Sequence, residues 1–240
     1  MSNDDIDRPV AGGNILRHKP RESDFAHPPH YAVHCEEIEA HLAKHVGPMH
    51  SVFHEIISDL VHLDVLWLQA TPERPYQMIV TSGMGDLPMT VPEGCEEFRH
   101  AELFMVLPPD WKIGEDDEQH YWPIRWLKQI GRLPHQYQTW IGHGHTIPNS
   151  DPPEPIADTK FVGVMATANY PLPEEFFQLG TKDGATICFY QLIPLYAEEM
   201  DLKLEKGSEE IESRFGKQNI DFVLDPRRPN VALKRGWWKW

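Results

Sequence analysis

Hydrophobic residues recur at the spacing of an amphipathic helix in several stretches of the chain. The first stretch, His34–Val46, ends at Gly47-Pro48, a pair that stops a helix. A second apolar stripe predicts a helix that begins at Pro123 and ends before Pro134, because proline is tolerated at the first helical position. Two closing helices are predicted over Tyr196–Glu205 and Ser208–Phe215.

Shorter apolar runs of strand length predict a sheet. They span His62–Gln69, Tyr76–Ser82, Glu102–Leu107, Phe161–Ala166 and Thr186–Ile193. Several strands follow one another and the helices come singly, so strand and helix do not alternate throughout. The order favours an α+β fold, with a central mixed, largely antiparallel sheet packed with helices in a single domain.

Composition and charge narrow the function classes. The 240 residues carry 22 bases and 37 acids, a net charge of −15 that disfavours nucleic-acid binding. The excess acids gather in Glu93–Glu118 and Glu198–Glu212, either as solvated faces or as an acidic surface for a basic partner. The apolar run Leu103–Leu107 is far too short to span a membrane. Three scattered cysteines give no disulfide framework, so we expect a cytoplasmic protein.

Common enzyme fingerprints are missing from the chain. Gly83-Met84-Gly85-Asp86 lacks the third glycine of a dinucleotide-binding loop. His54-Glu55 opens like a zinc-protease helix, but Ser58 stands where the second histidine is needed. We therefore expect a non-catalytic protein without a cofactor.

The motif His143-Gly144-His145 keeps one enzymatic alternative open. In an extended segment the two imidazoles lie on one face, where they can share a metal ion. The nominal third ligands are His135, His50, His54 and Asp151. The simpler interpretation is that both histidines order a loop.

Aromatic residues gather around the same motif, at Trp122, Trp126, Tyr137 and Trp140. Such residues belong either to the core or to a protein interface. A second group, Trp237, Trp238 and Trp240, ends the sequence, and we expect it to pack on its own domain or on a partner.

Taken together, these segments resemble the bacterial branch of the suppressor-of-fused family. The resemblance covers about Tyr31 to Gly216. The residues that carry it are Gly47-Pro48, Phe53-His54-Glu55, Leu63-Asp64-Val65, Thr71-Pro72-Glu73-Arg74-Pro75, Thr81-Ser82-Gly83-Met84-Gly85, Glu102-Leu103, Leu107-Pro108-Pro109-Asp110-Trp111, Trp122-Pro123-Ile124-Arg125, Leu127-Lys128, Thr139-Trp140, Gly144-His145-Thr146-Ile147-Pro148, Lys160-Phe161, Phe189-Tyr190-Gln191-Leu192-Ile193-Pro194-Leu195-Tyr196 and Glu198-Glu199-Met200. The expected organisation is a flexible polar tail over 1–30, a suppressor-of-fused-like domain over 31–216 and a Trp-rich extension over 217–240.

The resemblance implies a binding function. The animal protein is not an enzyme and sequesters a transcription factor by gripping a short peptide, whereas some bacterial members are immunity proteins that neutralise toxins. The segment Leu133–His145 matches the region that approaches the peptide in the animal protein, and His145 is the clearest match. The second lobe of the animal protein has no counterpart in this sequence.

We therefore expect a partner-sequestering protein, with a protein or peptide partner such as a basic toxin, and with neither nucleic acid nor membrane as a partner. The predicted partner-binding residues are Leu133, Tyr137, Trp140, His143, Gly144, His145 and Thr146. An extended peptide can pair with an open sheet edge there, and the acidic stretches can steer its approach. The alternatives are the metal-dependent enzyme and a structural module without a toxin.

Overall fold

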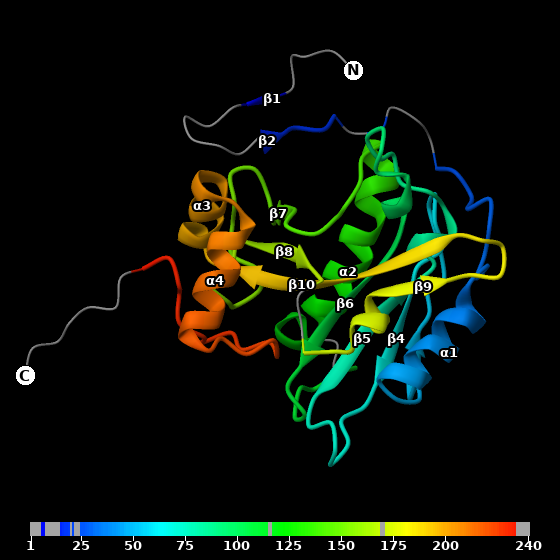
Figure 1. Cartoon of the computed structure of the whole chain (residues 1–240), viewed down its shortest axis with the longest axis horizontal. Coiled ribbons are helices and arrows are strands. Elements are labelled where there is room, and N and C mark those ends of the chain that lie inside the picture. The colour runs from blue at the N-terminus through cyan, green and yellow to red at the C-terminus, as the bar shows by residue number, and fades with distance from the viewer. Residues whose placement is uncertain are drawn as a thin grey trace, which may run out of the picture.

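The sheet is arranged around one long central strand, β10 (Figure 1). The computed structural model describes residues 6–7, 15–19, 21, 25–114, 117–168 and 171–233. β10 (Thr186–Leu195) runs parallel to β6 (His100–Leu107) and antiparallel to β8 (Gly163–Thr167) and β9 (Gln178–Gly180). The full order is β3-β4-β5-β6-β10-β8-β7, with β3 at Ser51–Phe53, β4 at Asp64–Leu68, β5 at Gln77–Ser82 and β7 at Thr146–Pro148. The other pairs in this sheet are antiparallel, which confirms the predicted α+β class.

Helices cover both faces of this sheet. α2 (Glu118–Tyr137) packs on one face, while α1 (Cys35–His45) and the pair α3 (Ala197–Lys206) and α4 (Ser208–Gln218) flank the other (Figure 1). Alternate residues of β6 belong to opposite cores, since Leu103 and Met105 pack with α2 and Phe104 and Val106 pack with α1. A strand buried on both faces has a continuous run of apolar residues, as Leu103–Leu107 does.

The smaller elements complete the topology. In the described residues, 3₁₀ turns lie at η2 (Met84–Asp86), η3 (Glu96–Phe98) and η4 (Glu174–Phe177), and a separate two-stranded ladder joins β1 (Ile6–Asp7) to β2 (Ile15–Leu16). Helices α1, α3 and α4 and strands β4, β5, β6, β8 and β10 confirm the predicted elements to within a few residues. Among the described helices, none is long and apolar enough to cross a lipid bilayer.

The predicted bounds of the second helix are wrong. α2 begins five residues before Pro123 and continues one turn beyond Pro134, so both prolines lie inside it. The Asp117 carboxylate caps the start by accepting a hydrogen bond from the Gln119 N–H, and Gln138 ends the helix in a left-handed conformation. Burial of α2 against the sheet outweighs the missing N–H groups of the two prolines, a tertiary effect that local propensity does not include.

The carboxyl-terminal segment is fastened to α3 by a buried ion pair. The fully buried Glu199 carboxylate accepts hydrogen bonds from the Arg228 guanidinium and from the N–H groups of Tyr196 and Val231. Residues 219–233 therefore pack on the domain. The expected packing of Trp237, Trp238 and Trp240 concerns residues outside the described ranges.

A second buried carboxylate lies in the centre of the molecule. Glu102 on β6 is fully buried and accepts hydrogen bonds from the Thr81 hydroxyl and from the N–H groups of Gly83 and Gly85. Burial raises the pKa of Glu102 from 4.5 to about 7, because the charged form loses its hydration. Glu102 therefore does not contribute to the acidic surface expected from Glu93–Glu118.

This shift predicts a pH-dependent stability. Between pH 4.5 and pH 7 the folded chain holds the Glu102 proton that the unfolded chain releases, so rising pH lowers the free energy of unfolding. Glu102→Gln removes this effect, because its amide mimics the protonated acid. In urea unfolding, the free energy of unfolding of the variant minus that of wild type should increase by about 3 kcal/mol between pH 4.5 and pH 8. A difference that stays constant over this pH range would contradict the raised pKa of Glu102.

Candidate functional site

The predicted partner-binding residues lie between the end of α2 and β7. Leu133 and Tyr137 are half-buried on the last turns of α2, and the chain then turns back through Trp140 to reach Thr146. The Thr139 N–H donates to the Pro134 carbonyl, and the Thr90 N–H donates to the Thr139 carbonyl. The structure thus brings the seven residues into one continuous segment beside the sheet edge.

Trp140 and His145 form the aromatic centre of this segment. Their ring centroids lie 4.5 Å apart at 74°, an edge-to-face contact. Gly142 makes the contact possible, because a Cβ there would lie 2.6 Å from the Trp140 ring. The Gly142 N–H donates to His145 Nδ1 at 3.3 Å, which places the proton of the neutral imidazole on Nε2.

The charge state of His145 follows from its neighbours. Burial and the nearby Lys203 ammonium lower the pKa of His145, so the ring is neutral at neutral pH. Lys203, on α3, is itself half-buried, and burial lowers its pKa. Among the described residues no carboxylate pairs with Lys203, so it leaves a local positive charge beside the aromatic pair.

The geometry does not fit the metal centre that the sequence left open. Gly144 adopts a φ of +80°, so the motif is a turn and the two histidines do not share a face. His143 Nδ1 accepts the Ala168 N–H at 3.2 Å and its Nε2 lies 3.4 Å from Glu212 Oε1, whereas His145 packs on Trp140.

The nominal third ligands also have other partners. His50 packs on Trp67, His54 bonds to Asp64, His135 bonds to the Met84 carbonyl, and Asp151 pairs with Arg17. Within the described part of the chain, no group of three histidine, cysteine or acidic side chains is placed to hold a metal ion. The structure thus gives the metal alternative no support.

The outer edge of β7 lies beside the aromatic pair, because Thr146 directly follows His145. β7 ends the sheet, and its other side pairs with β8 at Thr146↔Met165 and Ile147↔Val164. The carbonyl of His145 and the N–H of Asn149 bond to the β8 side. Because backbone groups alternate along a strand, the N–H and C=O of Thr146 are directed away from β8.

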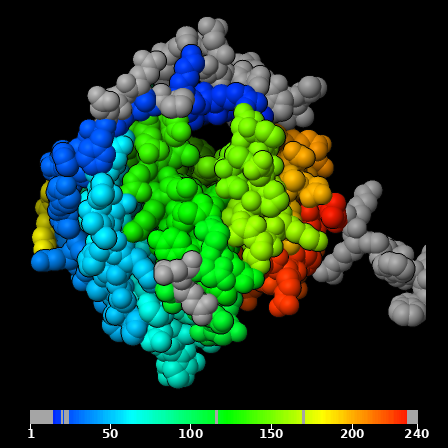
Figure 2. Space-filling view, turned by 180° about the vertical axis from the view of Figure 1, so that it is seen from behind, coloured from blue at the N-terminus to red at the C-terminus, as the bar shows by residue number. Residues whose placement is uncertain are grey.

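A segment near the amino terminus crosses this region. Arg17 forms an ion pair with Asp151, and the His18 ring lies 5.7 Å from the Tyr137 ring. Figure 2 shows this segment in blue above a hollow between α2, in green, and the yellow-green chain around residue 150. The predicted site is therefore partly bridged by residues that the sequence pattern had assigned to a tail.

The sequence did not identify the residues of α3 and α4 that lie beside the His143-Gly144-His145 motif. Lys203, Ser208 and Glu212 lie about 60 residues beyond the motif and reach it only through the fold. Their sequence context is an ordinary charged helix, so no local signal could have identified them.

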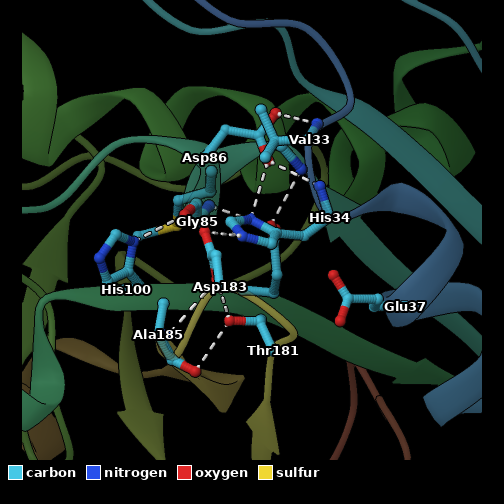
Figure 3. Close-up of polar contacts among 12 residues, drawn as sticks. Val33, His34, Glu37, Gly85, Asp86, His100, Thr181, Asp183 and Ala185 are labelled. Atoms are coloured by element: carbon cyan, nitrogen blue, oxygen red, sulfur yellow. Dashed lines mark hydrogen bonds and ion pairs between the residues drawn. The ribbon is translucent and has the colours of Figure 1, made fainter.

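The sequence also missed a polar cluster around the start of α1 (Figure 3). Asp86 accepts the N–H groups of Val33 and His34, and the buried His34 ring lies 3.3 Å from both Asp86 and Asp183. Asp183 also accepts from the Thr181 hydroxyl and the Ala185 N–H. The cluster ties α1 to η2 and to the turn between β9 and β10, which is a structural role.

Comparisons with known proteins agree on one family. A family model described as suppressor of fused protein (SUFU) matches residues 59–229. No curated protein matches the chain.

Three solved structures share the fold. A SUFU homologue from Neisseria gonorrhoeae is 18% identical with a TM-score of 0.58, over 83% of this chain and 97% of that one. A chain of a Sufu–Fu complex is 15% identical with a TM-score of 0.58, over 82% and 91%. Drosophila Suppressor of Fused is 14% identical with a TM-score of 0.59, over 90% of this chain and 52% of that one.

The turn at Gly144 yields a stability prediction. A Cβ at Gly144 would lie 2.6 Å from Ser208 Oγ, whereas Gly184 has a similar φ of +89° and open space around it. Both Gly→Ala changes strain the backbone, but only Gly144→Ala also crowds the Ser208 side chain at the start of α4. We expect Gly144→Ala to lower the free energy of unfolding by about 1–3 kcal/mol more than Gly184→Ala in urea titrations. Equal losses would show that the turn is not packed on α4.

Proposed function

The chain belongs to the suppressor of fused family, and on that premise we propose that it is a non-catalytic protein-binding domain. It captures an extended segment of a partner along the outer edge of β7, with which no strand of the described residues pairs. The observation that carries the proposal is the outward N–H and C=O of Thr146, which lie next to the Trp140–His145 pair. Strand addition supplies backbone hydrogen bonds, and neighbouring side chains supply specificity.

The side chains around the edge suit such a segment. Trp140 and Tyr137 are half-buried aromatic residues, the type that anchors protein interfaces. Lys203 provides a positive charge for an acceptor group on the bound segment. The Sufu–Fu complex among the solved structures supports protein binding as the function of this fold.

We further propose that the partner is a basic toxin that the domain neutralises, in the cytoplasm. The outer faces of α3 and α4 hold exposed acids, including Asp201, Glu205 and Glu209, close to the β7 side of the sheet. These acids attract a basic partner from a distance, while the edge and the aromatic pair bind it.

A proline substitution at the edge of β7 directly tests whether a partner segment binds there. Thr146→Pro removes the outward N–H without removing a bond to β8, whereas Thr146→Ala keeps the N–H. Tagged wild type and both variants are incubated with host extract, and the captured protein is identified by mass spectrometry. We expect Thr146→Pro to weaken its binding by about tenfold or more and Thr146→Ala to leave it nearly unchanged.

Equal capture by Thr146→Pro and wild type, with both folded by circular dichroism, would refute strand addition. The toxin proposal has a separate outcome. The captured protein should arrest growth when it is expressed alone, and co-expression of this chain should restore growth. A captured partner without toxicity would leave protein binding standing and overturn the immunity role.

Steering by the acidic helices predicts a salt effect. The association rate with the captured partner should fall about tenfold between 50 and 500 mM salt, while dissociation changes much less. Stopped-flow measurements of wild type and an Asp201→Asn/Glu205→Gln variant check this. An association rate that does not depend on salt would contradict the electrostatic part of the proposal.

A further inference from the structure

A groove of about 930 Å³ lies at the other end of α2 from the β7 edge. It opens between the start of α2, the start of α3 and the carboxyl-terminal segment. Its walls include Trp111, Trp122, Asp158, Tyr196, Glu198 and Leu233. Gln119 in this groove and Leu133 at the β7 edge are 14 residues apart on one helix, about 21 Å, so the groove is a separate surface.

An unsatisfied donor lies in the wall of the groove. Trp122 is fully buried, and its indole N–H has no hydrogen-bond acceptor among the described residues. The indole of Trp111, the neighbouring aromatic, already donates to the His120 carbonyl at 3.0 Å. A buried N–H without an acceptor costs free energy, so the described residues leave this wall of the groove incompletely satisfied.

The charges of the groove are also incompletely paired. The Asp158 carboxylate accepts a hydrogen bond from the Gln119 amide, and the Glu198 carboxylate accepts one from the Asn230 amide. Neither acid pairs with a cation in the part of the chain that the structure describes. Both side chains are exposed, so a basic occupant can reach them.

We propose that this groove is a peptide site for a basic, tryptophan-rich segment, and that its occupant is residues 234–240 of the same chain. This segment reads Lys-Arg-Gly-Trp-Trp-Lys-Trp. It follows Leu233 directly, and Leu233 lines the groove with 54% of its surface exposed. Seven residues reach up to about 24 Å, far enough to enter from that wall.

The chemistry of the segment complements the groove. Its three indoles bury a large apolar area against the aromatic walls, and their faces attract the exposed cations Lys160 and Arg227. Its own cations, Lys234, Arg235 and Lys239, match the acids Asp158 and Glu198. Gly236 permits the chain to turn back on itself. The proposal does not depend on partner capture at β7.

Photocrosslinking in the full chain tests this occupancy. Trp238 is replaced by the aromatic photocrosslinker p-benzoyl-phenylalanine, the protein is irradiated, and crosslinked peptides are mapped by mass spectrometry. We expect crosslinks within one chain to the peptides that contain Trp111, Gln119–Trp122 and Asp158–Lys160. The same photocrosslinker at exposed Glu205, on the far end of α3, should give no groove crosslinks.

A charge reversal provides the matched control. Asp158→Lys should lower the yield of groove crosslinks at least fivefold, whereas Asp201→Lys, an exposed aspartate outside the groove, should leave the yield unchanged. Crosslinks that join two chains would overturn occupancy by the same chain in favour of a second copy. Crosslinks spread over other surfaces, or a yield equally insensitive to both variants, would overturn the site itself.

Discussion

The buried ion pair of Glu199 and Arg228 is the interaction on which both proposed surfaces depend. Glu199 has no exposed surface, and its two oxygens accept from the Arg228 guanidinium and from two backbone N–H groups. The guanidinium also lies about 5 Å from the rings of Phe161, Tyr196 and Phe215. Removing one partner would leave a buried charge uncompensated, which typically costs 3–5 kcal/mol.

This pair sets the position of α3, and α3 in turn forms part of both surfaces. Its N-cap residue Tyr196 and its first-turn residue Glu198 line the groove, and its last turn supplies Lys203 to the aromatic pair at the β7 edge. The two proposed binding surfaces, at opposite ends of α2, therefore have α3 in common. A partner held along β7 and a segment held in the groove can occupy the molecule together, because their sites do not overlap.

The sequence predicts those elements that are determined by the local spacing of apolar residues, and it fails where tertiary packing decides the structure. The spacing of apolar residues was sufficient for α1 and for β10, since their patterns reflect burial on one or both faces. The extension of α2 through Pro123 and Pro134 was not predictable in this way, because packing on the sheet decides it. At the site, the sequence singled out Trp140 and His145 as separate candidate residues, but it did not predict their edge-to-face contact, which depends on Gly142. The two histidines of the motif point in different directions because Gly144 between them adopts a left-handed conformation, which the sequence does not reveal. Burial lowers the pKa of His145, and Lys203 lowers it further from a position about 60 residues away in the sequence, so only the fold brings the two together.

The central claim is that a partner segment forms hydrogen bonds with the outer edge of β7. Amide hydrogen exchange resolved at single residues tests it, in the free protein and in the complex with the captured partner. In the free protein the outward N–H of Thr146 should exchange fast and that of Ile147, which faces β8, should be protected. Saturation with partner should slow exchange at Thr146 by at least about a hundredfold and change Ile147 little. Unchanged exchange at Thr146 in the saturated complex would contradict the account.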